Sequence, residues 1–298
     1  MADTQLIFPD KPDVCANTFV IGAQKAGTTY LAALLDQSPE VCVSDPKEPQ
    51  FFTSHYESGF DAYAAIFADP QAKIRLDAST TYSFLRPKAD LDIPDAPGLA
   101  APVPQRILAA APDARFIYIL RDPVKRAASA HRHNMRSQPQ PTMPISLLRC
   151  LQENPMLAIA SRYAAQIERW LEHVPRERFL FVDFQRLVSD TENVIAEVCD
   201  FLDVQPGEIS LGQAERGKHS AYRDTGLGQA MRRAMRAMPG LSRSVKALVP
   251  ANLKQRVFDP VMKAPSEIVF YDELETYAVF AEDSARTQAL TGIAFHAQ

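Results

Sequence analysis

A loop that combines glycine, lysine and two threonine hydroxyls is the part of this sequence best suited to chemistry. It reads Gly22-Ala-Gln-Lys25-Ala-Gly27-Thr28-Thr29 and joins an apolar run to a run with helical spacing. Backbone N–H groups at the start of a helix, approached closely through glycine, bind anions such as phosphate. The sequence therefore predicts an anion site that offers one cation, two hydroxyls and backbone donors.

The position of the lysine argues against a nucleotide-triphosphatase loop. That loop reads GxxxxGK[ST], with the lysine directly after the second glycine. Here Lys25 comes two residues before Gly27, and Thr28 takes the place of the kinase lysine. Metal-assisted phosphoryl transfer also needs a carboxylate for Mg²⁺, for which Asp122 is the candidate. Two interpretations of this loop nevertheless stay open. One is a nucleotide-dependent phosphotransferase of the P-loop fold, and the other is a non-catalytic nucleotide-binding protein.

A second anion site is predicted where the apolar run FIYILRDP ends. Arg121 stands at the tip of this run, and the carboxyl end of a parallel strand faces the ligand crevice. The planar guanidinium of Arg121 suits a phosphate group. Ser129 follows eight residues later, two turns into the next expected helix. A nucleotide with phosphates on its 5′ and 3′ sides would need such a pair of sites.

Alternating strands and helices must position these groups. Buried strands are predicted at 17–22, 73–79, 114–123 and 178–184, and helices at 28–37, from 123 onward, at 156–173 and at 191–202. The near-continuous apolar run in 114–123 is typical of a parallel strand covered on both faces. The order predicts an α/β fold with a doubly wound, mostly parallel sheet, helices on both faces and a mainly helical C-terminal part.

Length and composition fit one domain. The 298 residues are 46% hydrophobic and 23% charged, which is ordinary for a globular chain, and we expect a single domain over 1–298. The net charge of −4 gives no reason to expect nucleic-acid binding. Segment 223–263 is basic, with nine Lys or Arg against two Asp. We expect a helical insertion or subdomain there, with a solvated face or a surface that attracts an anionic substrate or a membrane.

Cysteine spacing and hydropathy bear on the compartment. The four cysteines lie far apart without a CxxC pair, so we expect reduced thiols and no metal site or disulfide framework. The N-terminus lacks a basic stretch followed by an apolar one, and no run reaches about 18 unbroken apolar residues. We therefore expect no secretory signal, no integral membrane segment and a cytoplasmic location. The oligomeric state is left open.

Taken together, the motifs resemble the sulfotransferases that use 3′-phosphoadenosine 5′-phosphosulfate (PAPS). The resemblance rests on FVIGAQKAGTTYLAALLDQSPEVCVSDPKEPQFF followed by YILRDPVKRAASAH, and it runs from about Asn17 to Asp203. The sequence is most similar to the bacterial and heparan-sulfate-type branch, which shares a K-E-x-x-F-F element. The resemblance implies a P-loop sulfotransferase-like fold. It also implies metal-independent transfer of a sulfuryl group to a hydroxyl or amine, with release of 3′,5′-diphosphoadenosine (PAP).

The resemblance also implies roles for individual residues. The loop that holds the 5′-phosphosulfate matches Lys25, Ala26, Gly27, Thr28 and Thr29. The pair that binds the 3′-phosphate matches Arg121 and Ser129, and a basic loop near that phosphate matches Arg216, Gly217 and Lys218.

The chemistry needs a cation and a base. A leaving phosphate gains negative charge, which Lys25 would stabilise by about 3–4 kcal/mol, by analogy with single oxyanion donors. The acceptor must lose a proton, and Glu48 in the KEPQFF element (residues 47–52) matches the family's glutamate. The rival bases are His55, His131 and His133.

The acceptor is not encoded in these motifs. Heparan-type members usually place an acceptor-binding lysine after the acidic residue of the second strand, whereas here Ala78 follows Asp77. This departure weakens the case for a glycosaminoglycan. A small-molecule, a glycan and a lipid acceptor all stay open.

Overall fold

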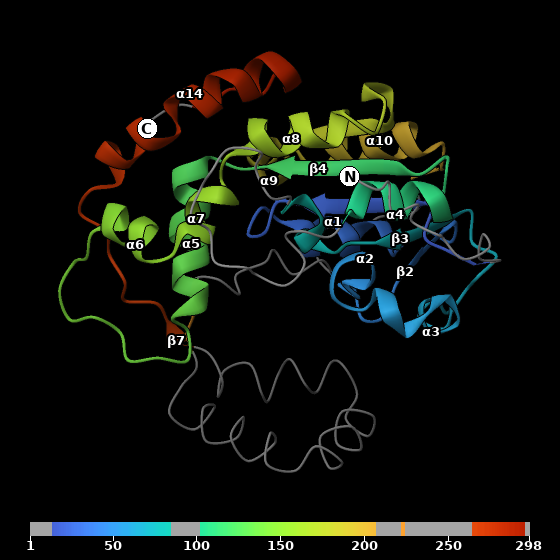
Figure 1. Cartoon of the computed structure of the whole chain (residues 1–298), viewed down its shortest axis with the longest axis horizontal. Coiled ribbons are helices and arrows are strands. Elements are labelled where there is room, and N and C mark those ends of the chain that lie inside the picture. The colour runs from blue at the N-terminus through green and yellow to red at the C-terminus, as the bar shows by residue number, and fades with distance from the viewer. Residues whose placement is uncertain (1–13, 85–101, 207–221, 224–263, 296–298) are drawn as a thin grey trace, which may run out of the picture.

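A five-stranded parallel sheet forms the centre of the computed structural model, which describes residues 14–84, 102–206, 222–223 and 264–295 (Figure 1). The strand order is β2-β3-β1-β4-β5. The strands are β1 (Thr18–Gly22), β2 (Val41–Val43), β3 (Ile74–Asp77), β4 (Arg115–Leu120) and β5 (Phe179–Asp183). The four predicted strands are confirmed. The three-residue strand β2 was not predicted, because so short a run carries no periodic signal.

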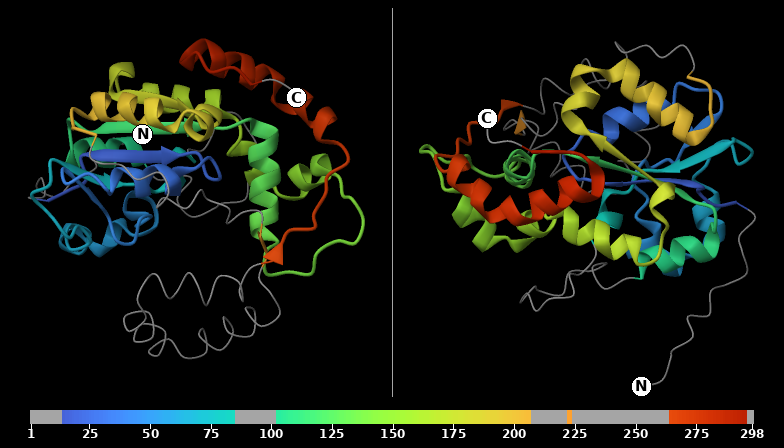
Figure 2. Two further views of the ribbon diagram at one scale, coloured as in Figure 1. Left: turned by 180° about the vertical axis from the view of Figure 1, so that it is seen from behind. Right: turned by 90° about the horizontal axis from the view of Figure 1, so that it is seen from above.

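Helices cover both faces of this sheet, as predicted. The longer helices of the described residues are α1 (Thr28–Leu35), α4 (Val103–Ala110), α5 (Pro123–Asn134), α8 (Tyr163–Leu171), α10 (Thr191–Leu202) and α14 (Glu273–Thr291). The short ones are α2 (Phe51–Ser54), α3 (Phe60–Ala64), α6 (Leu147–Glu153), α7 (Pro155–Ile159) and α9 (Phe184–Ser189). Figure 2 shows α1 and α10 on one face and α4 and α8 on the other.

The helix predicted over 156–173 is in fact two helices, α7 and α8. The chain is interrupted beside Arg126, whose buried guanidinium donates to Ser161 Oγ at 2.6 Å and to the Leu157 carbonyl at 2.6 Å. The single hydrogen of the Ser161 hydroxyl has two carbonyl oxygens within reach, those of Pro123 at 3.0 Å and Leu157 at 3.1 Å. Because these side chains take up a carbonyl that a continuous helix would use itself, α7 ends at Ile159.

The C-terminal helix α14 is joined to the rest of the fold by carboxylates that cap the starts of other helices. Asp283 accepts bonds from the backbone N–H groups of Ala164 and Ala165, at 3.1 and 3.2 Å, and so caps the start of α8. Asp272 accepts from Leu147 N at 2.6 Å at the start of α6. A separate apolar cluster, which includes Phe280, lies between these helices. The mainly helical C-terminal part is thus confirmed within the described residues.

Other sequence expectations meet the structure only in part. The four cysteines are buried free thiols, as expected. Within the described ranges, no helix has the length and hydropathy to span a bilayer. The basic segment 223–263 falls outside these ranges, apart from Arg223 in the short pairing of β6 (Tyr222–Arg223) with β7 (Ala264–Pro265). Its character as an insertion or subdomain, and the single-domain organisation of 1–298, stay predictions.

Candidate active site

The predicted phosphate loop is the turn between β1 and α1 at the carboxyl edge of the sheet. Gly27 is the N-cap of α1 with φ of 86°, a left-handed backbone that glycine adopts without strain. A Cβ atom there would also lie 3.2 Å from the Phe184 ring. Lys25 has a left-handed backbone as well, with φ of 71°. No side chain caps the first turn of α1, so its backbone donors suit an anion.

Lys25 lies among other cations. Its Nζ atom is 3.4 Å from Nδ1 of His133 on α5, and Arg136 Nη1 is 2.9 Å from Nε2 of the same ring. Burial and, to a smaller extent, the charges of Arg136 and Arg121 together lower the pKa of Lys25 to about 8, against an opposing effect of Glu48. An anion placed here would offset both the burial and the repulsion.

The KEPQFF element brings Glu48 to the same place. Lys47 Nζ lies 2.8 Å from Glu48 Oε1 and donates to Thr28 Oγ1 at 3.3 Å, so the lysine joins the carboxylate to the phosphate loop. The Thr80 hydroxyl donates to Glu48 Oε2 at 3.0 Å. Each carboxylate oxygen therefore has its own partner, and the side chain is held in one orientation.

Arg121 follows β4 and reaches back to the phosphate loop. Its Nη1 donates to the Lys25 carbonyl at 2.8 Å, and its guanidinium lies 4.7 Å from the centroid of the Phe184 ring. Tyr163 fixes the backbone by donating to the Arg121 carbonyl at 2.8 Å. Burial lowers the pKa of Arg121, and its buried Nε has no hydrogen-bond partner. Ser129 is buried two turns along α5.

Asp122, the candidate metal ligand of the phosphotransferase interpretation, is engaged by the chain itself. Its Oδ1 accepts from Lys125 N at 2.8 Å and caps α5. Its Oδ2 accepts from the Tyr277 hydroxyl of α14 at 2.9 Å. Both oxygens thus support helices at this edge, and the described part of the chain contains no group of three or more His, Cys, Asp or Glu residues that could hold a metal ion.

The three histidines considered as bases lie in different surroundings. His133 contacts Lys25. His131, on the same helix, turns into the second apolar cluster, with Nε2 3.8 Å from Cys150 Sγ and its ring 5.7 Å from that of Phe270. His55 is exposed after α2. Of the three, His133 is the one that the fold brings to Lys25.

The site also contains residues that the sequence analysis did not select. Arg136, one residue past the C-cap of α5, reaches the cluster through His133. Thr80 holds Glu48 from the short 3₁₀ helix Thr80–Ser83. Neither residue belongs to a recognised motif. The signal in the sequence was their nearness to selected residues, since Arg136 comes seven residues after Ser129 and Thr80 three residues after Asp77. Arg216, Gly217 and Lys218 lie outside the described residues.

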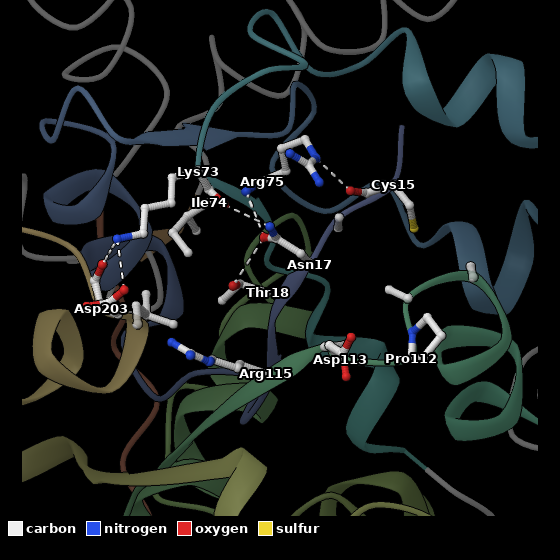
Figure 3. A pocket seen from close by; sticks show the side chains of 15 residues that line it. Cys15, Asn17, Thr18, Lys73, Ile74, Arg75, Pro112, Asp113, Arg115 and Asp203 are labelled. Carbon is white, nitrogen blue, oxygen red and sulfur yellow. Dashed lines mark hydrogen bonds and ion pairs between the residues drawn. The ribbon is translucent and has the colours of Figure 1, made fainter. Parts of the chain in front are cut away.

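A hollow of about 420 Å³ lies at the opposite, amino edge of the sheet (Figure 3). The starts of β1, β3 and β4 line it, together with Asp203 after α10. Its charges are matched within the chain, since Lys73 Nζ lies 3.0 Å from an Asp203 carboxylate oxygen and Arg75 Nε donates to the Cys15 carbonyl at 2.8 Å. None of the predicted site residues that the structure describes lines this hollow.

Comparisons with known proteins identify sulfotransferases as relatives of this chain. A family model described as the sulfotransferase domain matches residues 16–213. The human bifunctional heparan sulfate N-deacetylase/N-sulfotransferase 3 is 31% identical over 204 residues, which is 63% of this chain and 22% of that protein. Human heparan sulfate glucosamine 3-O-sulfotransferase 3B1 is 29% identical over 193 residues, which is 62% of this chain and 45% of that protein.

A solved structure extends the agreement to the fold. The sulfotransferase from Alicyclobacillus acidocaldarius superposes with a TM-score of 0.57 and 22% identity, covering 93% of this chain and 96% of that one. At this identity the likeness shows a shared architecture. The match spans less than half the length of either human relative.

Proposed function

This chain belongs to the sulfotransferase domain family, and we propose that it moves a sulfuryl group from PAPS to a hydroxyl or amine of an acceptor. The expected PAPS-dependent family is confirmed by the family match and by the named relatives. The roles of individual residues and the identity of the acceptor are our proposal.

The described residues fit a nucleotide with two phosphate groups. The uncapped first turn of α1 and the crowded Lys25 suit the 5′-phosphosulfate. The buried Nε of Arg121 lacks a partner and can donate to the 3′-phosphate, with Ser129 on the following helix. When bound, PAPS supplies the sulfuryl group and a phosphate leaving group.

Lys25 stabilises the charge that develops on the leaving phosphate. Its ammonium group sits in a partly buried position, where an electrostatic contact is stronger than in water. His133 Nδ1 lies 3.4 Å from this ammonium nitrogen, and the tautomer with its hydrogen on Nε2 would accept from Lys25 and orient it. No metal is needed for this step, since the positive charge comes from side chains.

Glu48 takes the proton of the acceptor. A carboxylate has about four lone-pair positions. Lys47 and Thr80 use one on each oxygen, so positions remain for the acceptor. The observation that carries the proposal is this placement of Glu48 and Lys25 in one cluster, joined through Lys47 and Thr28.

The test of the base role compares Glu48→Gln with His133→Gln, using PAPS, EDTA and a panel of hydroxyl and amine acceptors. Loss of a general base lowers turnover by about 10²–10⁴-fold, and we expect this for Glu48→Gln with PAP binding retained. His133→Gln should lose less, because glutamine can still accept from Lys25. Full turnover in Glu48→Gln with none in His133→Gln would move the base role to the histidine.

The acceptor is proposed only as a class. The named relatives act on heparan sulfate, which favours a glycan. Ala78, buried at the end of β3, stands where heparan-type members usually have an acceptor-binding lysine. A small molecule and a lipid therefore stay beside a glycan as proposals. A cytoplasmic location likewise stays a prediction.

A further inference from the structure

Asp77, at the carboxyl end of β3, is a buried carboxylate to which the proposed mechanism gives no role. Its side chain is fully buried. Oδ1 accepts from Ser79 N at 3.0 Å and from Ser79 Oγ at 2.6 Å. Oδ2 accepts from the hydroxyls of Tyr63 and Tyr82, each at 2.8 Å. Burial raises the pKa of Asp77 to about 6, against the opposing effect of its hydrogen bonds. Because this value is still below 7, the group is a carboxylate at neutral pH and can accept all four bonds.

Two of these donors continue to the KEPQFF element. Ser79 Oγ accepts from Gln50 N at 2.9 Å, and the Tyr82 hydroxyl accepts from Phe52 N at 3.3 Å. Each hydroxyl has one hydrogen, and giving it to Asp77 leaves the oxygen free to accept from the backbone. The carboxylate therefore fixes the direction of both hydrogen-bond chains.

The segment held in this way has an unusual backbone. Gln50 lies in the left-handed region with φ of 52°, which residues other than glycine seldom adopt. Its carbonyl accepts from the N–H groups of Thr53, Ser54 and His55 and so starts the following turn. Glu48 lies two residues before Gln50, and the Lys47 carbonyl accepts from Ala78 N at 3.2 Å. The stretch 77–82 thus contacts the element on both sides of Glu48.

We propose that Asp77 is a positioning residue for Glu48, acting through Ser79 and Tyr82 on the backbone of the KEPQFF element. The inference rests on the proposed role of Glu48 as the base. Asp77 does not touch the acceptor in this account. It keeps the Glu48 carboxylate at the place where Thr80 and Lys47 meet it.

Two tyrosines provide a matched pair of variants. Tyr82→Phe and Tyr63→Phe each remove one hydroxyl that donates to Asp77 Oδ2 at the same distance. Only the Tyr82 hydroxyl of this pair also accepts from the KEPQFF backbone. We expect Tyr82→Phe to lower kcat by about 10-fold or more and Tyr63→Phe by less than about 3-fold, because misplacement of a catalytic group by about 1 Å costs up to about 100-fold.

A double-mutant cycle separates positioning from general support of the fold. Asp77→Asn should lower kcat by about 100-fold in the native background. In a Glu48→Gln background it should lower the residual rate by less than about 2-fold, because the group that it positions is already disabled. Titration with PAP should give an unchanged Kd in every variant, since Lys25 and Arg121 are untouched.

Four results would overturn the inference. If Asp77→Asn lowers kcat equally in the native and Glu48→Gln backgrounds, Asp77 has a structural role alone. If Asp77→Asn fails to fold, the tyrosine pair decides, and an equal loss of kcat in Tyr82→Phe and Tyr63→Phe would mean the same. Full turnover in Glu48→Gln would remove the base role and this inference together. By contrast, an inactive Glu48→Gln beside a fully active Asp77→Asn would overturn this inference alone.

Discussion

The two edges of the central sheet both carry lysines and arginines, but these cations have partners within the chain at the amino edge and lie close to one another at the carboxyl edge. At the amino edge, Lys73 lies 3.0 Å from a carboxylate oxygen of Asp203 and 3.8 Å from one of Glu40. Arg115 there donates to the Phe201 carbonyl at 2.7 Å. At the carboxyl edge, Lys25 lies among Arg121, Arg136 and Lys47, and its pKa falls to about 8.

The comparison teaches that unbalanced charge marks the site better than a hollow does. The amino edge has a cavity of about 420 Å³, yet Lys73 and Arg115 there have partners within the chain. The carboxyl edge keeps an uncapped helix start and a buried Arg121 Nε without a partner. Burying several cations together is unfavourable unless an anion lies beside them. The carboxyl edge is therefore suited to an anionic ligand, whereas the cations of the amino edge already have partners in the chain.

The largest expected effect comes from removing the central cation. Lys25→Ala should lower turnover by at least about 100-fold, because a single donor to a developing oxyanion contributes that much. Steady-state kinetics with saturating PAPS measure it, and a thermal unfolding curve checks the fold. The variant should be no less stable, since the lysine is held at a lowered pKa among like charges. Turnover within a few-fold of the native value would take Lys25 out of the mechanism.

Arg121→Ala should have the next largest effect, on nucleotide binding. Hydrogen bonds to charged groups contribute about 1.5–3 kcal/mol, so PAP affinity should fall by about 10–100-fold. Adenosine 5′-phosphosulfate, which lacks the 3′-phosphate, should lose much less. Calorimetry with both ligands tests the assignment. Equal losses for the two would show that Arg121 does not read the 3′-phosphate.

The lowered pKa of Lys25 predicts a proton linked to binding. In the free protein Lys25 loses its proton as the pH rises through about 8. A bound phosphate favours the charged form and raises this pKa. At pH 8.5, PAP binding should therefore take up a fraction of a proton, and affinity should weaken as the pH rises further. Calorimetry in buffers of different ionisation enthalpy measures the uptake, with Lys25→Met as the control. Uptake that persists in that variant would assign the proton to another group.

The smallest effect is expected at the amino edge. Lys73→Ala removes a cation from an exposed pair with Asp203, and surface substitutions of this kind usually change stability by no more than about 0.5 kcal/mol. Because Lys73 lies far from the proposed site, we expect turnover and PAP affinity to change by no more than about 2-fold. Turnover and PAP titration of this variant, beside Lys25→Ala, compare the two edges directly. A loss of PAP binding here would break the comparison and place a nucleotide contact at the wrong end of the sheet.

Much of the candidate site could be proposed from sequence because its groups are carried by local patterns. The glycines and hydroxyls of the phosphate loop, and Arg121 at the tip of an apolar run, follow from how parallel strands end. Arg136 was missed because it lies after a helix, where no periodicity constrains it. The proposed role of Asp77 was missed because only the tertiary fold brings Tyr63 to this carboxylate and the KEPQFF backbone to Ser79 and Tyr82.

The fold was predictable to a similar degree. Strands with long apolar runs were found, whereas β2 was too short to register. The break between α7 and α8 depends on Arg126, which lies more than thirty residues before Ser161 in the chain. Such a contact leaves no mark in the local periodicity of 156–173, so a continuous helix was the natural expectation from sequence.

Calorimetric titration with PAP in the presence of EDTA tests the central claim most directly, with 5′-AMP and with ATP plus Mg²⁺ as the comparisons. The account predicts that PAP binds without metal and more tightly than either comparison ligand, because two separate cationic positions at the carboxyl edge meet its two phosphates. Preference for ATP with Mg²⁺, or no binding of PAP, would contradict it.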